Sequence, residues 1–241
     1  ASVARADVRL SRDCLAEPGR VTAYRNTLQG LGELPLTGQE VKAVARTFGA
    51  GPGSLVLKKD FTEPRVEGSK LDRYRVLYFA THALLPAEFD CQPEASLVTS
   101  LSDPPRAGED GLIDTTEVLK LDLDADLVVL SACNTGGPGG HEGGESLSGL
   151  ARAFFFAGAR SMLVSHWPVE DAATADLMVR LFRTERARPE LGLAESLRQA
   201  QLTLIADARR PGLEFRSHPL FWGAFTLVGD GARGVSGRRG Q

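Results

Sequence analysis

The sequence predicts a three-layer α/β domain in which helices flank a mainly parallel sheet. Residues 75–81, 125–131 and 160–165 are continuous apolar runs with β-branched or aromatic members, a pattern typical of strands buried in a parallel sheet. Segments in which apolar residues recur at helical spacing lie between these runs and after them. The chain has 241 residues, 42% of them apolar, and shows no linker after residue 35. We therefore expect one domain with a full core.

The first helix is expected just after a short N-terminal segment. Apolar residues at helical spacing lie between Val41 and Phe48, and Thr37 with Glu40 fits a capping box at the start of this helix. The glycines of residues 49–53 are expected to end it. Before it, Glu17–Arg20 indicates a turn, and after it Ser54–Leu57 is a strand candidate.

The rest of the chain alternates between strand and helix patterns, with a Gly-rich loop at residues 134–144. Strands are expected at residues 75–81, 95–100, 125–131, 160–165 and 221–228. Helices are expected at residues 115–119, 146–157, 172–186 and 192–207.

Composition sets limits on the function. The formal net charge of −3 gives no global sign of binding to nucleic acid or to an anionic membrane. The three cysteines, Cys14, Cys91 and Cys133, are odd in number and form no CxxC pair, which argues against a disulfide framework or a structural zinc site. The sequence shows no signal-like N-terminus and no apolar run of membrane-spanning length. We expect a reduced, cytoplasmic protein.

Two reactive side chains follow two of the expected strands. His82 comes directly after residues 75–81, and Cys133 comes just after residues 125–131. Ligands of open α/β sheets bind beyond the carboxyl ends of the strands, so parallel neighbouring strands would bring these residues to one edge. A thiolate activated by an imidazole performs acyl transfer, and the same imidazole can protonate the leaving amine. Position alone also fits a buried cysteine and a surface histidine.

The residues around this pair resemble a known family. Tyr78–His82 reads YFATH, Val129–Gly136 reads VLSACNTG, and 51 positions separate the histidine from the cysteine. Both segments resemble the CHAT domain, a relative of separase and the caspases, in which about 50 residues separate the pair. Four further blocks resemble it in the same order: Leu34–Val41, Gly144–Ala159, Trp167–Asp171 and His218–Gly229. The resemblance implies a caspase-like domain over residues 34–230, an N-terminal extension or lead-in strand over 1–33 and a flexible tail over 231–241.

The resemblance also implies roles for individual residues. Cys133 would be the nucleophile and His82 the general acid–base of a cysteine endopeptidase, with the backbone amides of Ala83 and Cys133 as oxyanion donors. Asp171 resembles the carboxylate with which separase-like enzymes bind a basic substrate side chain, although it also fits an N-cap. Glu145 and Ser131 are further candidates for substrate binding, and a first-turn Glu is equally ordinary helix-dipole chemistry.

Partners and cofactors follow from the same resemblance. The expected partner is a protein or peptide substrate. Upstream TPR repeats or a regulatory protein are a second kind of expected partner. Binding to nucleic acid or to a membrane is not expected. No cofactor and no metal are expected, because a zinc site of His82, Cys133 and His166 would lack a compact spacing. A partly buried, hydrogen-bonded His166 is the simpler expectation.

The sequence argues against two other functions and leaves a third open. The glycines of residues 137–139 do not form a GxxxxGK[ST] or GxGxxG phosphate loop. A serine hydrolase fails because Ser148 stands where the GxSxG motif needs glycine. A catalytically silent or autoinhibited interaction domain stays open, although the presence of both His82 and Cys133 argues against lost activity.

Overall fold

The computed structural model describes residues 18–32, 34, 36–84, 94–102, 109–131, 146–167 and 171–235. Its main sheet has four strands in the order β1 (Val76–Phe79), β5 (Leu127–Leu130), β6 (Ser161–Ser165) and β7 (Phe225–Gly229). The first three strands run parallel, and β7 pairs with β6 in the antiparallel direction. The predicted parallel strands are confirmed. Their sequences are continuously apolar because both faces of this sheet are covered.

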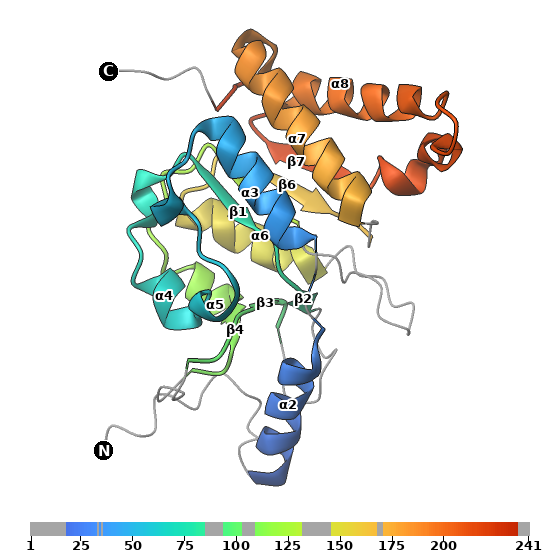
Figure 1. Cartoon of the computed structure of the whole chain (residues 1–241). Helices are drawn as coiled ribbons and strands as arrows, with labels where there is room; N and C mark the ends of the chain where they lie inside the picture. Colours follow the sequence, from blue (N-terminus) through green and yellow to red (C-terminus); the bar gives the residue numbers. More distant parts are fainter. Residues whose placement is uncertain are drawn as a thin grey trace.

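Helices cover both faces of the sheet, which confirms the three-layer architecture (Figure 1). One face packs on α3 (Thr37–Phe48), α7 (Asp171–Ala187) and α8 (Gly192–Asp207) through a core that includes Leu127, Val129 and Leu163. The other face packs on α6 (Ser146–Ala157) through a core that includes Val128, Leu130 and Met162. Successive strand residues alternate between the two cores, as the pleat requires.

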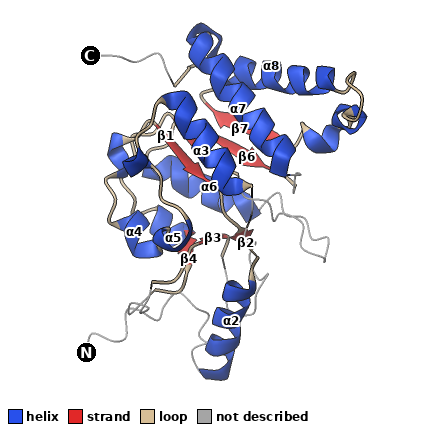
Figure 2. Cartoon of the chain, in the orientation of Figure 1, coloured by secondary structure: helices blue, strands red, loops and turns tan. Residues whose placement is uncertain are grey.

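A second, antiparallel sheet lies beyond the carboxyl end of β1 (Figure 2). Its strands are β2 (Ala83–Leu84), β3 (Ser96–Val98) and β4 (Leu112–Asp114), in that order. The short helices α4 (Glu63–Glu67) and α5 (Thr115–Val118) lie near it, and Asp114 and Glu117 form a complete capping box for α5. β2 follows directly after His82, so this sheet fixes the backbone that carries the imidazole.

Short 3-10 helices make up many of the connections. They are η2 (Pro52–Ser54), η3 (Lys58–Asp60), η4 (Leu71–Arg73), η5 (Pro189–Leu191), η6 (Glu214–Ser217) and η7 (Pro219–Phe221). The strand expected at Ser54–Leu57 is absent, since Ser54 ends η2 and the next residues have no ladder. The last strand begins at Phe225 rather than residue 221, because Pro219 starts η7 instead.

The N-terminal part differs from the expected turn. Residues Pro18–Gly30 form α2, with Pro18 at the helix start, where its missing N–H costs no hydrogen bond. Leu28 of α2 packs against Leu84, Val98 and Leu112 of the second sheet. The sequence also offers Val3–Leu10 as a strand candidate, and these residues lie outside the described part.

The start of α3 also differs from expectation. The helix follows Leu36, which makes no side-chain capping bond, so the capping box of Thr37 and Glu40 does not form. Glu40 turns into the protein instead and is 4% exposed. Gly49 ends the helix with a φ of 66°, in the left-handed region that glycine adopts freely.

Residues 231–235 pack on the domain. The backbone carbonyls of Gly231 and Arg233 accept hydrogen bonds from the start of α8, and Val235 is 7% exposed within the core. Residues 231–235, which open the expected flexible tail, thus contact the domain, and residues 236–241 lie outside the described part. No helix in the described ranges is long and apolar enough to cross a membrane.

Candidate active site at the carboxyl edge of the sheet

The strands that precede His82 and Cys133 are parallel neighbours. Phe79, the last residue of β1, is paired in register with Leu130, the last residue of β5. Ser131 continues the ladder by donating its backbone N–H to the carbonyl of Phe79 at 2.9 Å. His82 therefore lies at the same sheet edge as Ser131. Cys133 itself lies outside the described residues, two positions after Ser131 in the sequence.

Hydrogen bonds hold both the imidazole and the backbone of His82. Its Nε2 lies 2.9 Å from the carbonyl oxygen of Gly32, in the connection between α2 and α3. A carbonyl only accepts, so Nε2 carries the proton, and Nδ1 of the neutral ring is left as the acceptor. The backbone carbonyl of His82 accepts from Val98 N at 2.9 Å, and Thr81 Oγ1 donates to Val98 O at 2.7 Å. In the neutral ring, Nδ1 is therefore the nitrogen that can accept a proton.

Ala83 is buried at 1% exposure and pairs with Leu97 in the β2–β3 ladder. Because Val98 N donates to His82 O, Ala83 occupies a position where the residues of the two strands exchange no hydrogen bonds. The N–H of Ala83 consequently points away from β3. The oxyanion role of this amide stays a prediction.

Ser131 belongs to a buried polar cluster that the sequence did not reveal. Its Oγ donates to Glu40 Oε1 at 3.0 Å, and the hydroxyl of Tyr78 donates to the same oxygen. Ser131 is 6% exposed, so its predicted contact with substrate would have to coexist with this bond. The available signal was position, because Glu40 lies one helical turn before the buried Val44 on the same face of α3.

His166 lies at the end of the next strand but turns toward β7. Its backbone N–H donates to Ala224 O at 2.9 Å, and its Nε2 lies 2.9 Å from Thr226 Oγ1. The side chain is exposed rather than partly buried, although it has the expected hydrogen-bond partner. Beside it, Trp167 Nε1 donates to Leu220 O at 3.1 Å. His166 is therefore engaged with β7.

A network of ion pairs anchors η6, which directly precedes the η7 segment whose Leu220 carbonyl contacts Trp167. Asp176 of α7 accepts from Arg180 at 2.7 Å and from Arg216 of η6 at 2.6 Å, and Arg180 also reaches Asp207 at 2.6 Å. Burial alone would raise the pKa of Asp176, but hydrogen bonds and charge from the two arginines outweigh it and lower that pKa. The network ties η6 to α7 and α8.

Two of the predicted substrate-binding residues remain predictions. Glu145 lies outside the described residues. Asp171 is the first residue of α7, but its side chain lies outside the described part, so neither the contact with substrate nor the capping role is tested. Within the described part, the carboxylates that lie close enough to share a metal ion are Glu63, Glu67 and Glu117, none of which is a candidate catalytic or substrate-binding residue.

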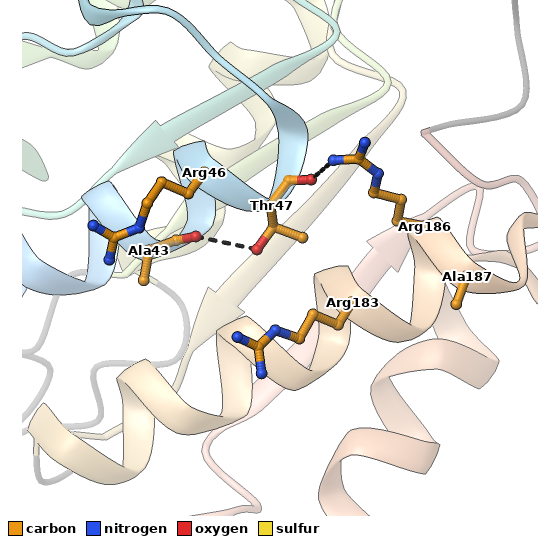
Figure 3. A pocket seen from close by; sticks show the side chains of 6 residues that line it. All are labelled: Ala43, Arg46, Thr47, Arg183, Arg186 and Ala187. Atoms are coloured by element: carbon orange, nitrogen blue, oxygen red, sulfur yellow. Dashed lines mark hydrogen bonds between the residues drawn. The ribbon is translucent and has the colours of Figure 1, made fainter.

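A basic hollow lies between α3 and α7, lined by Ala43, Arg46, Thr47, Arg183, Arg186 and Ala187. Arg186 donates to the backbone carbonyl of Thr47, and Figure 3 shows the three guanidinium groups well separated, with no common point of convergence. The lining contains no cysteine and no histidine, and its one hydroxyl group, Thr47 Oγ1, donates to the backbone carbonyl of Ala43 at 3.1 Å. It is therefore not the candidate active site.

Comparison with known proteins agrees with this arrangement. The family model of the CHAT domain, a caspase-like domain related to peptidases, matches residues 5–230. Tetratricopeptide repeat protein 28 of Mus musculus is 28% identical over 228 residues, which cover 82% of this chain and 9% of that protein. Tetratricopeptide repeat protein 28 of Homo sapiens is 30% identical over 145 residues, 60% of this chain and 5% of that protein. The chain thus spans less than a tenth of the length of these relatives, and it belongs to the CHAT domain family.

Proposed function

We propose that this chain is a cysteine endopeptidase that cleaves protein substrates through a thioester on Cys133. The observation that carries the proposal is the position and tautomer of His82. Its Nε2–H is held by Gly32 O, so Nδ1 is the ring atom left to accept a proton at the sheet edge. The sequence places Cys133 two residues beyond Ser131, which lies at that edge on the neighbouring strand.

The proposed reaction has two halves. Nδ1 of His82 takes the proton of the Cys133 thiol, and Sγ attacks the scissile carbonyl to form a tetrahedral oxyanion. The backbone amides of Ala83 and Cys133 are the proposed donors to that oxyanion. Collapse of the oxyanion breaks the C–N bond, His82 protonates the leaving amine, and a thioester remains. Water, deprotonated by His82, then releases the acid and the free thiol.

Gly32 has a supporting role in this scheme. When His82 carries both protons, the imidazolium keeps its Nε2–H bond to the Gly32 carbonyl, and a charged donor strengthens that bond. The carbonyl dipole therefore stabilises the charged ring that forms during attack. The scheme needs no metal and no cofactor.

Substrate recognition and context extend the proposal. Asp171, Glu145 and Ser131 are proposed to contact the substrate, with Asp171 paired to a basic side chain. The relatives carry the tetratricopeptide repeat in their names, so we propose upstream tetratricopeptide repeats or a regulatory protein as partners. The proposed compartment is the cytoplasm, where thiols stay reduced.

The competing function is a protein-interaction domain without catalysis. The names of the two relatives describe repeats rather than a peptidase, which is the observation in its favour. The two functions differ in one measurable property, since only a peptidase needs a Cys133 thiol that reacts faster in the presence of His82.

The test is cleavage of a randomised peptide library by the wild type and by Cys133→Ala, with Cys91→Ser as the control for loss of a cysteine. We expect cleavage by the wild type and by the control, and none by Cys133→Ala, with unchanged circular dichroism in all three. Cleavage retained by Cys133→Ala would remove Cys133 from the mechanism. A wild type that neither cleaves nor reacts with a thiol-directed probe would favour the interaction domain.

A further inference from the structure

Glu40 is a buried carboxylate between the two strands that lead to the candidate catalytic pair. It lies in the first half of α3, is 4% exposed, and faces the sheet with Val44. Its Oε1 accepts a hydrogen bond from the hydroxyl of Tyr78 on β1 and another from Ser131 Oγ after β5, the latter at 3.0 Å. One carboxylate oxygen therefore joins the ends of both strands.

The two hydroxyl groups are themselves held in place. Tyr78 is paired in register with Val129, and its ring packs on Phe182 of α7 at a centroid distance of 6.3 Å. Ser131 is fixed by the bond from its backbone N–H to Phe79 O at 2.9 Å. Because both donors are anchored, their distance from Glu40 is set by the sheet and by the docking of α3. The carboxylate therefore acts as a cross-link of fixed geometry.

Energetics favour a role in geometry over a role in stability. A buried carboxylate is costly unless it is hydrogen-bonded, and an apolar residue of similar volume often gives equal or greater stability. Directional bonds to one oxygen, in contrast, specify where two strand ends lie relative to each other. A buried Glu at this edge is thus better suited to aligning the two strand ends than to stabilising the core.

We infer that Glu40 is a positioning residue for the proposed hydrolysis, because its carboxylate sets the end of β5, from which the chain continues to Cys133, against the end of β1, from which it continues to His82. This inference rests on the proposed function. The same N-terminal part of the chain also orients the imidazole, since Gly32 O contacts His82 Nε2 at 2.9 Å. Gly32 therefore orients the imidazole of His82, and Glu40 positions the strand end that leads to Cys133.

The kinetic test compares three substitutions. Catalytic groups must be held within about 0.5 Å of the productive geometry, and a 1 Å displacement costs on the order of 10²-fold in rate. We expect Glu40→Ala to lower kcat on the order of 10²-fold with KM changed by less than about threefold. Glu40→Gln keeps an acceptor oxygen for both hydroxyls and is expected to stay within about fivefold of the wild type. Ser131→Ala, which removes one of the two bonds, should lie between them.

Glu185 supplies the matched control. It is a fully buried carboxylate of α7, close to Gly234 rather than to the catalytic edge. Glu185→Ala is expected to lower the free energy of unfolding while kcat stays within about twofold of the wild type. An equal loss of kcat in Glu185→Ala and Glu40→Ala would mean that lost stability, and not alignment, explains the effect.

A second readout does not depend on finding a substrate. In a Cys14→Ser, Cys91→Ser background, iodoacetamide reports the reactivity of Cys133 alone. The acceleration due to His82 is the rate measured with His82 present divided by the rate measured after His82→Ala. We expect a ratio well above one in the wild type, close to one in Glu40→Ala, and largely restored in Glu40→Gln, with circular dichroism unchanged.

The outcomes separate this inference from the proposed function. If Glu40→Ala keeps both the kcat and the His82-dependent ratio of the wild type, Glu40 does not position the pair, and the peptidase proposal stands. If the wild type itself shows a ratio of one, Cys133 and His82 do not act together, and both proposals are wrong. If Glu40→Ala does not fold, Ser131→Ala decides, since an unchanged ratio in that variant would overturn the inference.

Discussion

Phe154 of α6 is the side chain whose removal tests the layered packing around the site most sharply. It is fully buried against the sheet, and its ring centroid lies 5.5 Å from that of Phe79 on β1. Replacing a buried Phe by Ala costs about 3–5 kcal/mol, from lost transfer free energy and from the cavity left behind. With an m-value of roughly 2–3 kcal/mol/M for a domain of this size, the urea midpoint should fall by roughly 1–2.5 M.

The same helix offers a matched control. Phe156 lies two positions further along α6 and is 82% exposed, so Phe156→Ala makes the same chemical change at the surface. Its free energy of unfolding should stay within about 0.5 kcal/mol of the wild type. Urea titrations followed by circular dichroism measure both variants. Equal losses in the two variants, or a small loss in Phe154→Ala, would refute the packing of α6 on this face of the sheet.

Three further predictions concern other parts of the chain. Gly158 has a φ of 115°, and a Cβ there would lie 2.0 Å from Leu123 O, so Gly158→Ala should lower the melting temperature by several degrees, a cost of more than about 1 kcal/mol in a thermal scan. The pKa of Asp176 is lowered from its ordinary 3.8, so the contribution of its ion pairs to stability is present above pH 3.8 and is lost as the pH falls further. In Asp176→Asn, the free energy of unfolding should therefore depend less on pH in that acid range, as measured by urea titrations at several pH values. Asp171→Asn should weaken any preference for Arg or Lys in a cleavage profile by about tenfold or more, since a charge-assisted pair is lost, and an unchanged profile would assign Asp171 to helix capping instead.

The strands and long helices could be predicted because local patterns and tertiary packing agree in them. β1, β5 and β6 are apolar on both faces, and a sheet covered by helices on both sides requires that composition. α2 could not be predicted, because it is held through contacts such as that of Leu28 with the distant second sheet, and its own sequence has no apolar stripe.

Glu40 shows the limit of motif reasoning at the candidate site. The spacing from Thr37 to Glu40 matches a capping box, but the helix start is uncapped and the carboxylate bonds Tyr78 and Ser131 instead. A motif four residues long cannot reveal partners 38 and 91 positions away in the sequence. The position of His82 at a strand end was predictable from the sheet rule, whereas the Gly32 carbonyl that fixes its tautomer was not.

The rate at which iodoacetamide alkylates Cys133 at neutral pH, with and without His82, tests the central claim most directly. The proposed pair predicts faster alkylation in the wild type than in His82→Ala, in a background without Cys14 and Cys91, with both proteins folded by circular dichroism. Equal rates in the two proteins would contradict the account, because a thiol that does not respond to the imidazole cannot be the nucleophile of this dyad.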